Sequence, residues 1–487
     1  MSAKPSKQWA KTGTTFERLF GDSEAAFYPG SKVGLGDMFL HLDFRAPQPA
    51  VLRERVTIAW AIIRRRHPVL MCRVIYDSAI GIPYFSFTPP ANSLMEAGDA
   101  LSFNNKSKDE LIFEYMNGRR TLSDEHLSHL VISASHLAPT SSTPSGASDE
   151  DFTLFLCAPH FLGDGISLHQ TAHDLLSLLA SPLTNSQLEE ELNRDIEWTD
   201  LLPPSFETRL DAPTSSLAKI ACKVDFIKTL GKDIGGHTLP RKQRGSPQTV
   251  IYEAAFSEDD TALILRKCKA NNVTVNHALI ALCNLVWARN VSDPRLKENP
   301  MMMYTAINLR PHLTGSLHPS NTYWFMALTY SNIVLPGFVP GTPQVFWHRA
   351  RSVKHQLTRV IRSPLLKSRA LEMAQMRVAR SRGEVVDLPT LDNSSELSLP
   401  PAPSAALLGV SLPGNLDATY DRSSYPSFHL HSVTAASRMK AGGLLLIGHT
   451  FAKKLCLQLC WDENGFEEGH IERFWRGLQD AVHQSFI

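Results

Sequence analysis

The sequence predicts an α/β protein built from two lobes, and three observations support this. Both halves alternate between short apolar runs of strand length and longer stretches with helical apolar spacing. The 487 residues suffice for two or three domains, or for one large bilobed unit. From about residue 181 to 249 the periodicity fades while prolines and charges accumulate, as in a crossover between lobes. We therefore expect an N-terminal lobe over residues 1–200, a linker over 201–249 and a C-terminal lobe over 250–487.

The N-terminal half is expected to begin with a strand over 37–44 and an amphipathic helix over 49–68. Apolar residues in the helix repeat at three and four positions from Leu52 to Ile63. The helix ends before Pro68, because a proline disfavours helical geometry in the residue before it. We expect the arginines 64–66 to be solvated at the helix end, where the dipole favours cations. Further strands are predicted for IPYFSFT (82–88), LIFEYM (111–116) and HLVISA (129–134).

The segment 151–165, DFTLFLCAPHFLGDG, carries the main functional signal. An apolar run of strand length ends at Pro159 and His160, and Asp164 follows between two glycines. The next residues have the spacing of an amphipathic helix, so the motif joins a buried strand to a helix. The unperturbed pKa of histidine is about 6.5, which lets the ring accept a proton near neutral pH and return it. From the residues alone, His160 is therefore a candidate general base at the mouth of a pocket, and a histidine that only forms hydrogen bonds in a core is the alternative.

The second half is expected to open with a strand, VIYEAAF, followed by a helix capped by Ser257 and a second, buried helix capped by Thr274. A strand from Met301 then leads to Asn308, Leu309, Arg310 and Pro311. A strand region is predicted over 321–336, and helix over 349–376 with a break at Pro364. The strands FHLHSVTA, GLLLIGHTF and KLCLQLCWD and a helix over about 467–484 complete the expected C-terminal lobe.

The spacing H-x-x-x-D-G over 160–165 resembles the active-site signature of the HxxxD acyltransferase superfamily. That superfamily includes BAHD acyltransferases, chloramphenicol acetyltransferase and the condensation domains of peptide synthetases. RRRHP before the motif and NLRP after it resemble the matching segments in the same order. The resemblance implies two chloramphenicol-acetyltransferase-like lobes, each a mixed β-sheet flanked by helices, with the active-site tunnel between them. It also implies that His160 is the general base and that Asp164 belongs to the same catalytic motif and pairs with Arg310. Gly165 and Arg310 are expected to support the site.

Two departures from the superfamily pattern narrow the resemblance. Position 159 is proline, so the doubled histidine of peptide condensation domains is absent. The DFGWG signature of plant BAHD enzymes is also absent, which points to fungal alcohol acyltransferases resembling trichothecene 15-O-acetyltransferases. Residues 405–420 resemble a segment near the catalytic centre of the fungal enzymes. Within it, Ser411 and Asn415 are candidate substrate-binding and oxyanion-stabilising residues, and both also suit a turn.

Other chemistries are disfavoured by the residues present. HQTAH (169–173) has the histidine spacing of a helical zinc hydrolase, but Gln170 replaces the glutamate that would activate water, so we expect no metal. Cys157 alternates with apolar strand neighbours and is expected to pack as a small hydrophobe. There is no G-x-S-x-G elbow and no phosphate-binding Gly-Lys-Ser/Thr loop. Lys and Arg total 49 against 48 acidic residues, so the overall charge favours neither nucleic acid nor an anionic membrane.

The sequence thus predicts an acyl-CoA-dependent O-acyltransferase, with acetyl-CoA as the expected co-substrate and no bound cofactor. The acceptor is expected to be a hydroxyl of a hydrophobic secondary metabolite such as a terpenoid or polyketide. Two alternatives stay open: an enzyme of this fold that uses an acyl carrier protein or catalyses a condensation or cyclisation, and a non-catalytic binding protein. The amino terminus lacks the apolar core of a signal peptide, and no stretch reaches the roughly 18 apolar residues of a membrane helix. We expect a cytoplasmic monomer without membrane insertion.

Overall fold

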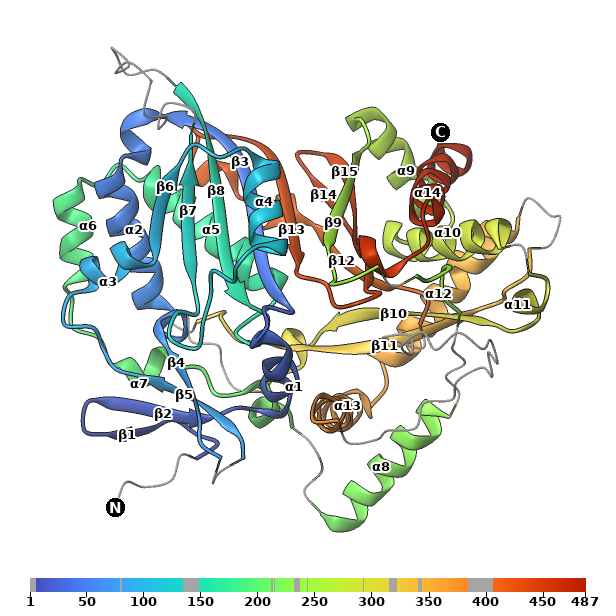
Figure 1. Ribbon diagram of the computed structural model, residues 1–487, viewed down its shortest axis with the longest axis horizontal. Coiled ribbons are helices and arrows are strands. Elements are labelled where there is room, and N and C mark those ends of the chain that lie inside the picture. Colours follow the sequence, from blue (N-terminus) through green and yellow to red (C-terminus); the bar gives the residue numbers. More distant parts are fainter. Residues whose placement is uncertain are drawn as a thin grey trace.

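The computed structural model describes most of the chain and arranges it as two lobes side by side (Figure 1). The described residues are 6–78, 81–134, 149–211, 213, 215–231, 237–242, 244–291, 293–314, 322–339, 344–383 and 406–487. Each lobe is a mixed sheet flanked by helices, as the sequence predicts. Among the described residues, none of the helices combines the length and the apolar composition that a membrane-spanning segment requires.

The sheet of the N-terminal lobe has the strand order β13-β3-β8-β7-β6. Strand β8 lies at its centre and pairs antiparallel with β3 along its whole length, from Asp37 opposite Pro159 to Pro47 opposite Asp149. Alternate side chains point to opposite faces, so Leu154 and Leu156 enter the helix-covered core while Phe155 faces the second lobe. The bounds of the strands are β3 Asp37–Pro47, β6 Leu101–Asn104, β7 His129–Ser133, β8 Asp149–Pro159 and β13 His429–Ser437.

Strand β13 comes from the C-terminal half of the chain but belongs to the N-terminal sheet. It pairs antiparallel with β3, from His429 opposite Arg45 to Ser437 opposite Met38. The prediction that this strand completes the C-terminal lobe is therefore wrong. An apolar pattern of period two shows that a strand has one buried face, but it does not say which sheet edge the strand joins. The chain thus crosses between the lobes twice in its last part, into β13 and back to β14.

The sheet of the C-terminal lobe has the order β11-β10-β12-β14-β15-β9. Helices from the same half cover one face and form a core with it. The other face meets the N-terminal sheet, where Ile447 and Cys460 pack with Phe39, Phe155 and Cys157. The bounds of the strands are β9 Thr249–Ala255, β10 Met301–Asn308, β11 Leu328–Leu335, β12 Gly409–Asn415, β14 Leu444–Phe451 and β15 Lys454–Asp462.

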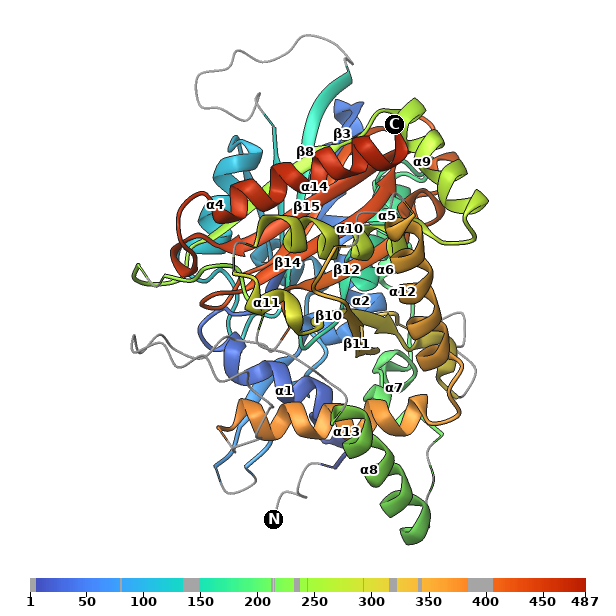
Figure 2. The same cartoon turned by 90° about the vertical axis from the view of Figure 1, so that its right-hand side faces the viewer.

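A third, antiparallel sheet lies at the edge of the N-terminal lobe, with the order β1-β2-β5-β4. Its strands are β1 Ala10–Thr12, β2 Thr15–Leu19, β4 Arg73–Tyr76 and β5 Pro83–Phe87. The helices of the N-terminal region are α1 Asp22–Ser31, α2 Arg53–Arg66, α3 Ser93–Asp99, α4 Lys108–Asn117, α5 Gly165–Leu179 and α6 Asn185–Leu192. Those that follow are α7 Trp198–Leu201, α8 Ser216–Leu230, α9 Glu258–Ala270, α10 Val275–Asn290, α11 Arg295–Glu298, α12 Val345–Ile361, α13 Leu366–Ser381 and α14 His470–Phe486. In both views α13 lies beside α1, and α8 projects from the body of the molecule (Figures 1 and 2).

Two local predictions in the N-terminal half are wrong. LIFEYM lies in helix α4, because Ser107 and Glu110 form a capping box and the buried residues Leu111 and Tyr115 are one helical turn apart. Arg64 is buried rather than solvated, and its guanidinium pairs with Glu96 and Ser128. An apolar run of six residues is compatible with either a strand or a helix, and the cap decides between them.

Candidate active site

His160 stands directly after the last residue of β8, where the chain turns toward α5. Its backbone N–H donates to the carbonyl of Gly36 at 3.1 Å, which fixes His160 beside the turn that precedes β3. Its ring Nδ1 lies 3.0 Å from the carbonyl oxygen of Gly163. A carbonyl can only accept, so Nδ1 carries the hydrogen and Nε2 has a free lone pair. Nε2 has no hydrogen-bond partner among the residues described, and the side chain is partly exposed.

The surroundings of His160 keep its imidazole neutral. Burial lowers the pKa of His160, and the nearby cation of Arg377 lowers it further. The carboxylate of Asp164 and the carbonyl of Gly163 raise that pKa, but they do not outweigh burial. A neutral ring with its lone pair on Nε2 is the form that can remove a proton.

An aromatic stack positions the His160 ring from the side. The ring of Phe27 in α1 lies 4.5 Å from the imidazole, with 25° between the planes. The Arg377 guanidinium of α13 lies 4.4 Å from the Phe27 ring and 4.5 Å from the ring of Tyr330 in β11. The stack therefore connects His160 in the first lobe to α13 and β11 in the second.

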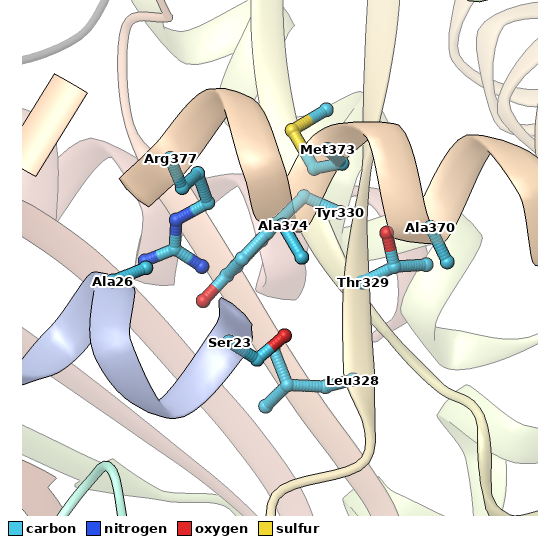
Figure 3. A pocket seen from close by; sticks show the side chains of 9 residues that line it. All are labelled: Ser23, Ala26, Leu328, Thr329, Tyr330, Ala370, Met373, Ala374 and Arg377. Carbon is cyan, nitrogen blue, oxygen red and sulfur yellow. The ribbon is translucent and has the colours of Figure 1, made fainter. Parts of the chain in front are cut away.

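A small crevice lies beside this stack, between α1, α13 and β11. Figure 3 shows the Arg377 side chain extending from α13 toward α1, with Tyr330 beside it and Ser23 and Ala26 on the α1 side. The crevice has a cavity volume of about 10 Å³, which is room for one water. It is too small for an acyl donor or acceptor.

Asp164 organises the turn after His160. Its Oδ1 accepts from the backbone N–H groups of Ile166 (3.1 Å) and Ser167 (3.3 Å), so the carboxylate caps the start of α5. Its Oδ2 lies 2.5 Å from Nη1 of Arg310, and both side chains are largely buried. Both carboxylate oxygens are engaged by these partners, which gives Asp164 a structural position in the turn.

Arg310 connects the motif turn to the second lobe. It follows β10, and its Nη2 donates to Ser167 Oγ at 3.2 Å and to the carbonyls of Tyr323 and Phe325 at 3.1 and 2.9 Å. The guanidinium also lies 4.9 Å from the Phe325 ring. One cation thus satisfies the buried charge of Asp164 and holds the chain from 322 to 327 against α5.

The two glycines of the motif differ in their surroundings. A Cβ at Gly163 would lie 2.8 Å from the Trp324 ring, whose Nε1 donates to Thr171 Oγ1 in α5 at 2.7 Å. Trp324 is fully buried, so Gly163 is required by close packing. A Cβ at Gly165 would meet nothing within 4 Å.

The remaining predicted residues, Ser411 and Asn415, both lie in strand β12. Strand β12 places Gly409 beneath the side chain of Tyr304, and Ser411, two residues on, lies on the same face of the sheet. A bulge follows Ser411. Asn415 is exposed, and its amide oxygen accepts from Asp417 N at 3.1 Å and Thr450 Oγ1 at 3.2 Å. Asn415 is therefore engaged in the turn that follows β12.

The two histidines of HQTAH contact tyrosines that are distant in sequence. His169 Nδ1 lies 2.9 Å from the hydroxyl of Tyr420, and His173 Nδ1 lies 3.3 Å from that of Tyr425. Within the described ranges, no group of His, Cys, Asp and Glu could hold a metal ion. Cys157 is buried, and burial raises the pKa of its thiol, which keeps it protonated.

Sequence reasoning missed Phe27, Arg377 and Trp324. The sequence pattern predicts a strand over 321–336, but Tyr323–Phe325 precede β11 and form no strand. Three adjacent aromatic rings do not fit the alternation of a half-buried strand, which is the signal that could have identified this segment. Phe27 and Arg377 lie in helices about 350 residues apart in sequence, 377 against 27, so only the packing of α1 on α13 brings them together.

The two lobes, each a mixed sheet flanked by helices, form the fold of the condensation and chloramphenicol-acetyltransferase-like acyltransferases. The structure of the trichothecene 15-O-acetyltransferase TRI3 from Fusarium sporotrichioides is similar over 99% of this chain and 98% of that one, with a TM-score of 0.79 and 15% identity. The first condensation domain of the CDA synthetase is similar over 98% of both chains, with a TM-score of 0.62 and 13% identity.

Sequence comparison also finds a trichothecene O-acetyltransferase, with a match over only about half of the chain. Trichothecene O-acetyltransferase TRI3 of Trichoderma arundinaceum is 24% identical over 274 residues. The match spans 51% of this chain and about half the length of that relative, 51%. No protein-family model matches the sequence.

Proposed function

We propose that this protein is an acyltransferase that moves an acyl group from a CoA thioester to a hydroxyl of an apolar acceptor. The observation that carries the proposal is the state of His160: a neutral ring, fixed through Nδ1, whose Nε2 has no described partner. The fold shared with TRI3 supports acyl transfer as the reaction class. The proposed acceptor is a terpenoid or polyketide alcohol, and the proposed acyl group is acetyl.

In the proposed mechanism, Nε2 of His160 removes the proton of the acceptor hydroxyl as its oxygen attacks the thioester carbonyl. The new carbon–oxygen bond gives a tetrahedral intermediate with a negatively charged oxygen. When the intermediate collapses, the carbon–sulfur bond breaks and the imidazolium returns its proton to the departing thiolate. The products are the ester and free CoA, and the histidine is neutral again. The Gly163 carbonyl favours the Nδ1–H tautomer and accepts from Nδ1 while the ring is charged.

The other motif residues have supporting roles in this proposal. Asp164 and Arg310 fix the turn that aims His160, and they do not transfer the proton. Gly165 leaves open space at the start of α5, which we assign to the passage of substrate. Ser411 faces the side of the sheet that carries Tyr304 and is the proposed oxyanion donor, whereas Asn415 serves the turn.

The test is release of CoA thiol from acetyl-CoA in the presence of a panel of hydroxylated terpenoids and polyketides. We expect ester formation by the wild-type protein. The His160→Ala variant should lose activity by a factor of about 10² to 10⁴, because general-base catalysis typically contributes that much. His431→Ala is the matched control, since this histidine is exposed near the start of β13.

The outcomes of this assay separate the alternatives. If turnover requires an acyl group loaded on a carrier protein, the carrier protein replaces CoA as the acyl donor and the proposed role of His160 is unchanged. Saturable binding of acceptors without turnover from either donor would identify a binding protein of this fold. Full activity in folded His160→Ala would refute the proposed mechanism.

A further inference from the structure

Helix α8 exposes a row of large apolar side chains on the side away from the body of the protein. The row consists of Leu217, Ile220, Val224 and Ile227, with exposed fractions of 79, 61, 45 and 55%. Their spacing of three, four and three residues places them along one face of the helix. A contiguous exposed aliphatic face of this kind usually marks an interaction surface.

The opposite face attaches α8 firmly to the protein. Cys222 and Phe226 are buried, and Asp225 forms two hydrogen bonds with Arg369 of α13, at 2.7 and 3.1 Å. The orientation of the helix is therefore fixed, with the apolar row turned outward. Figures 1 and 2 show α8 projecting from the molecule in both views, so an extended surface can reach it.

The charges on α8 indicate which kind of partner surface the helix would bind. Lys219, Lys223 and Lys228 are exposed and flank the apolar row, with Lys228 on one side and the other two on the opposite side of the helical wheel. Asp225 is the one acidic residue in the sequence of the helix, and it is paired with Arg369. The outward side of α8 is thus aliphatic along its middle and cationic along both edges.

We propose that α8 docks the protein on the surface of a bilayer that contains anionic lipid. The helix would lie in the plane of the interface, with the four aliphatic side chains among the acyl chains and the lysines at the headgroups. A second copy of this chain fits less well, because pairing the two rows would place lysines against lysines without an acidic partner. Helix α8 packs on α13, which carries Arg377 of the stack beside His160, so docking would bring the candidate site near a store of apolar acceptors.

The experiment is cosedimentation of the full-length protein with vesicles of phosphatidylcholine, alone or mixed with phosphatidylserine. We expect binding to the mixed vesicles that weakens as salt is raised, because the lysine contribution is screened. Ile220→Ser combined with Val224→Ser should weaken binding at least about tenfold. Lys223→Gln combined with Lys228→Gln should remove the preference for phosphatidylserine.

Met95→Ser in α3 is the control, because Met95 is a similarly exposed apolar residue (67%) outside α8 and should leave binding unchanged. Thermal unfolding of all variants should match the wild type, since the substituted side chains are exposed. Wild-type protein that stays in the supernatant with every vesicle would overturn the proposal. So would a wild-type dimer that the α8 variants dissociate, or α8-dependent binding to an acidic protein without binding to vesicles.

Discussion

The pKa of His160 depends on burial and on two charged neighbours of opposite sign, and the effect of each charge can be tested separately. Burial and Arg377 lower that pKa, while Asp164 raises it. Under the proposed function, the acid limb of the pH profile of kcat/KM reports protonation of His160 in the free enzyme. Removing the cation and removing the anion should therefore move this limb in opposite directions.

For Arg377→Gln we expect the acid limb to move to higher pH. The variant removes a positive charge that disfavours the imidazolium, so the ring takes up a proton at higher pH. The measurement is kcat/KM of acyl transfer between about pH 5 and pH 8. Arg351→Gln makes the same charge change on the exposed side of α12 and should leave the limb in place. An unmoved limb in Arg377→Gln would show that the stack acts only through packing.

For Asp164→Asn we expect the limb to move to lower pH, together with a loss of stability of about 3 kcal/mol. The asparagine oxygen can still cap α5, but the guanidinium of Arg310 loses its charged partner. Activity should fall because the turn that aims His160 loosens. Denaturant unfolding measures the stability, and the double variant with Arg310→Gln should cost less than the sum of the two single changes. Strict additivity would contradict the importance of the ion pair.

At the scale of elements, the turn between β8 and α5 is where sequence and structure agree best. The buried strand, the Asp164 cap and the amphipathic helix follow from local spacing, because each depends on residues that are close together in sequence. The prediction that Arg310 pairs with Asp164 rests on the family resemblance, since nothing local links residues 146 positions apart. The edge that β13 joins, the burial of Arg64 and the Phe27–Arg377 stack depend on tertiary packing and leave no periodic signal.

The motif glycines give a paired test at this scale. Gly163→Ala should destabilise the protein by about 1–3 kcal/mol, because the new methyl would overlap the buried Trp324 ring. Gly165→Ala should leave stability unchanged or slightly higher, since alanine favours a helix and the site is open. Under the proposed function, the same methyl should raise KM for substrate. Thermal unfolding and steady-state kinetics check both variants, and equal stability of the two would contradict the packing argument.

At the scale of the whole molecule, buried histidines join segments that are distant in sequence. His67, at the end of α2, lies 2.6 Å from Thr322 Oγ1, and its ring lies 4.1 Å from that of Tyr323. His169 in α5 contacts Tyr420, which precedes β13. Both histidines belong to the N-terminal lobe, and both partners come from the C-terminal half of the chain. Segments from the two halves of the chain are therefore joined through histidine side chains.

This arrangement predicts that acid destabilises the protein. Burial lowers the pKa of His67 and of His169 to about 3, whereas an unfolded chain has a histidine pKa of about 6.5. Below the histidine pKa of the unfolded chain, the unfolded state binds protons that the folded state does not bind. The stability contribution is therefore complete above about pH 6.5 and falls toward pH 3. Each histidine contributes a slope of about 1.4 kcal/mol per pH unit within that window.

Denaturant unfolding measured across this pH window should show a shallower dependence of stability on pH for His67→Gln and for His169→Gln. The exposed control His431→Gln should keep the wild-type slope, and unchanged slopes in both buried variants would show that other groups drive acid unfolding.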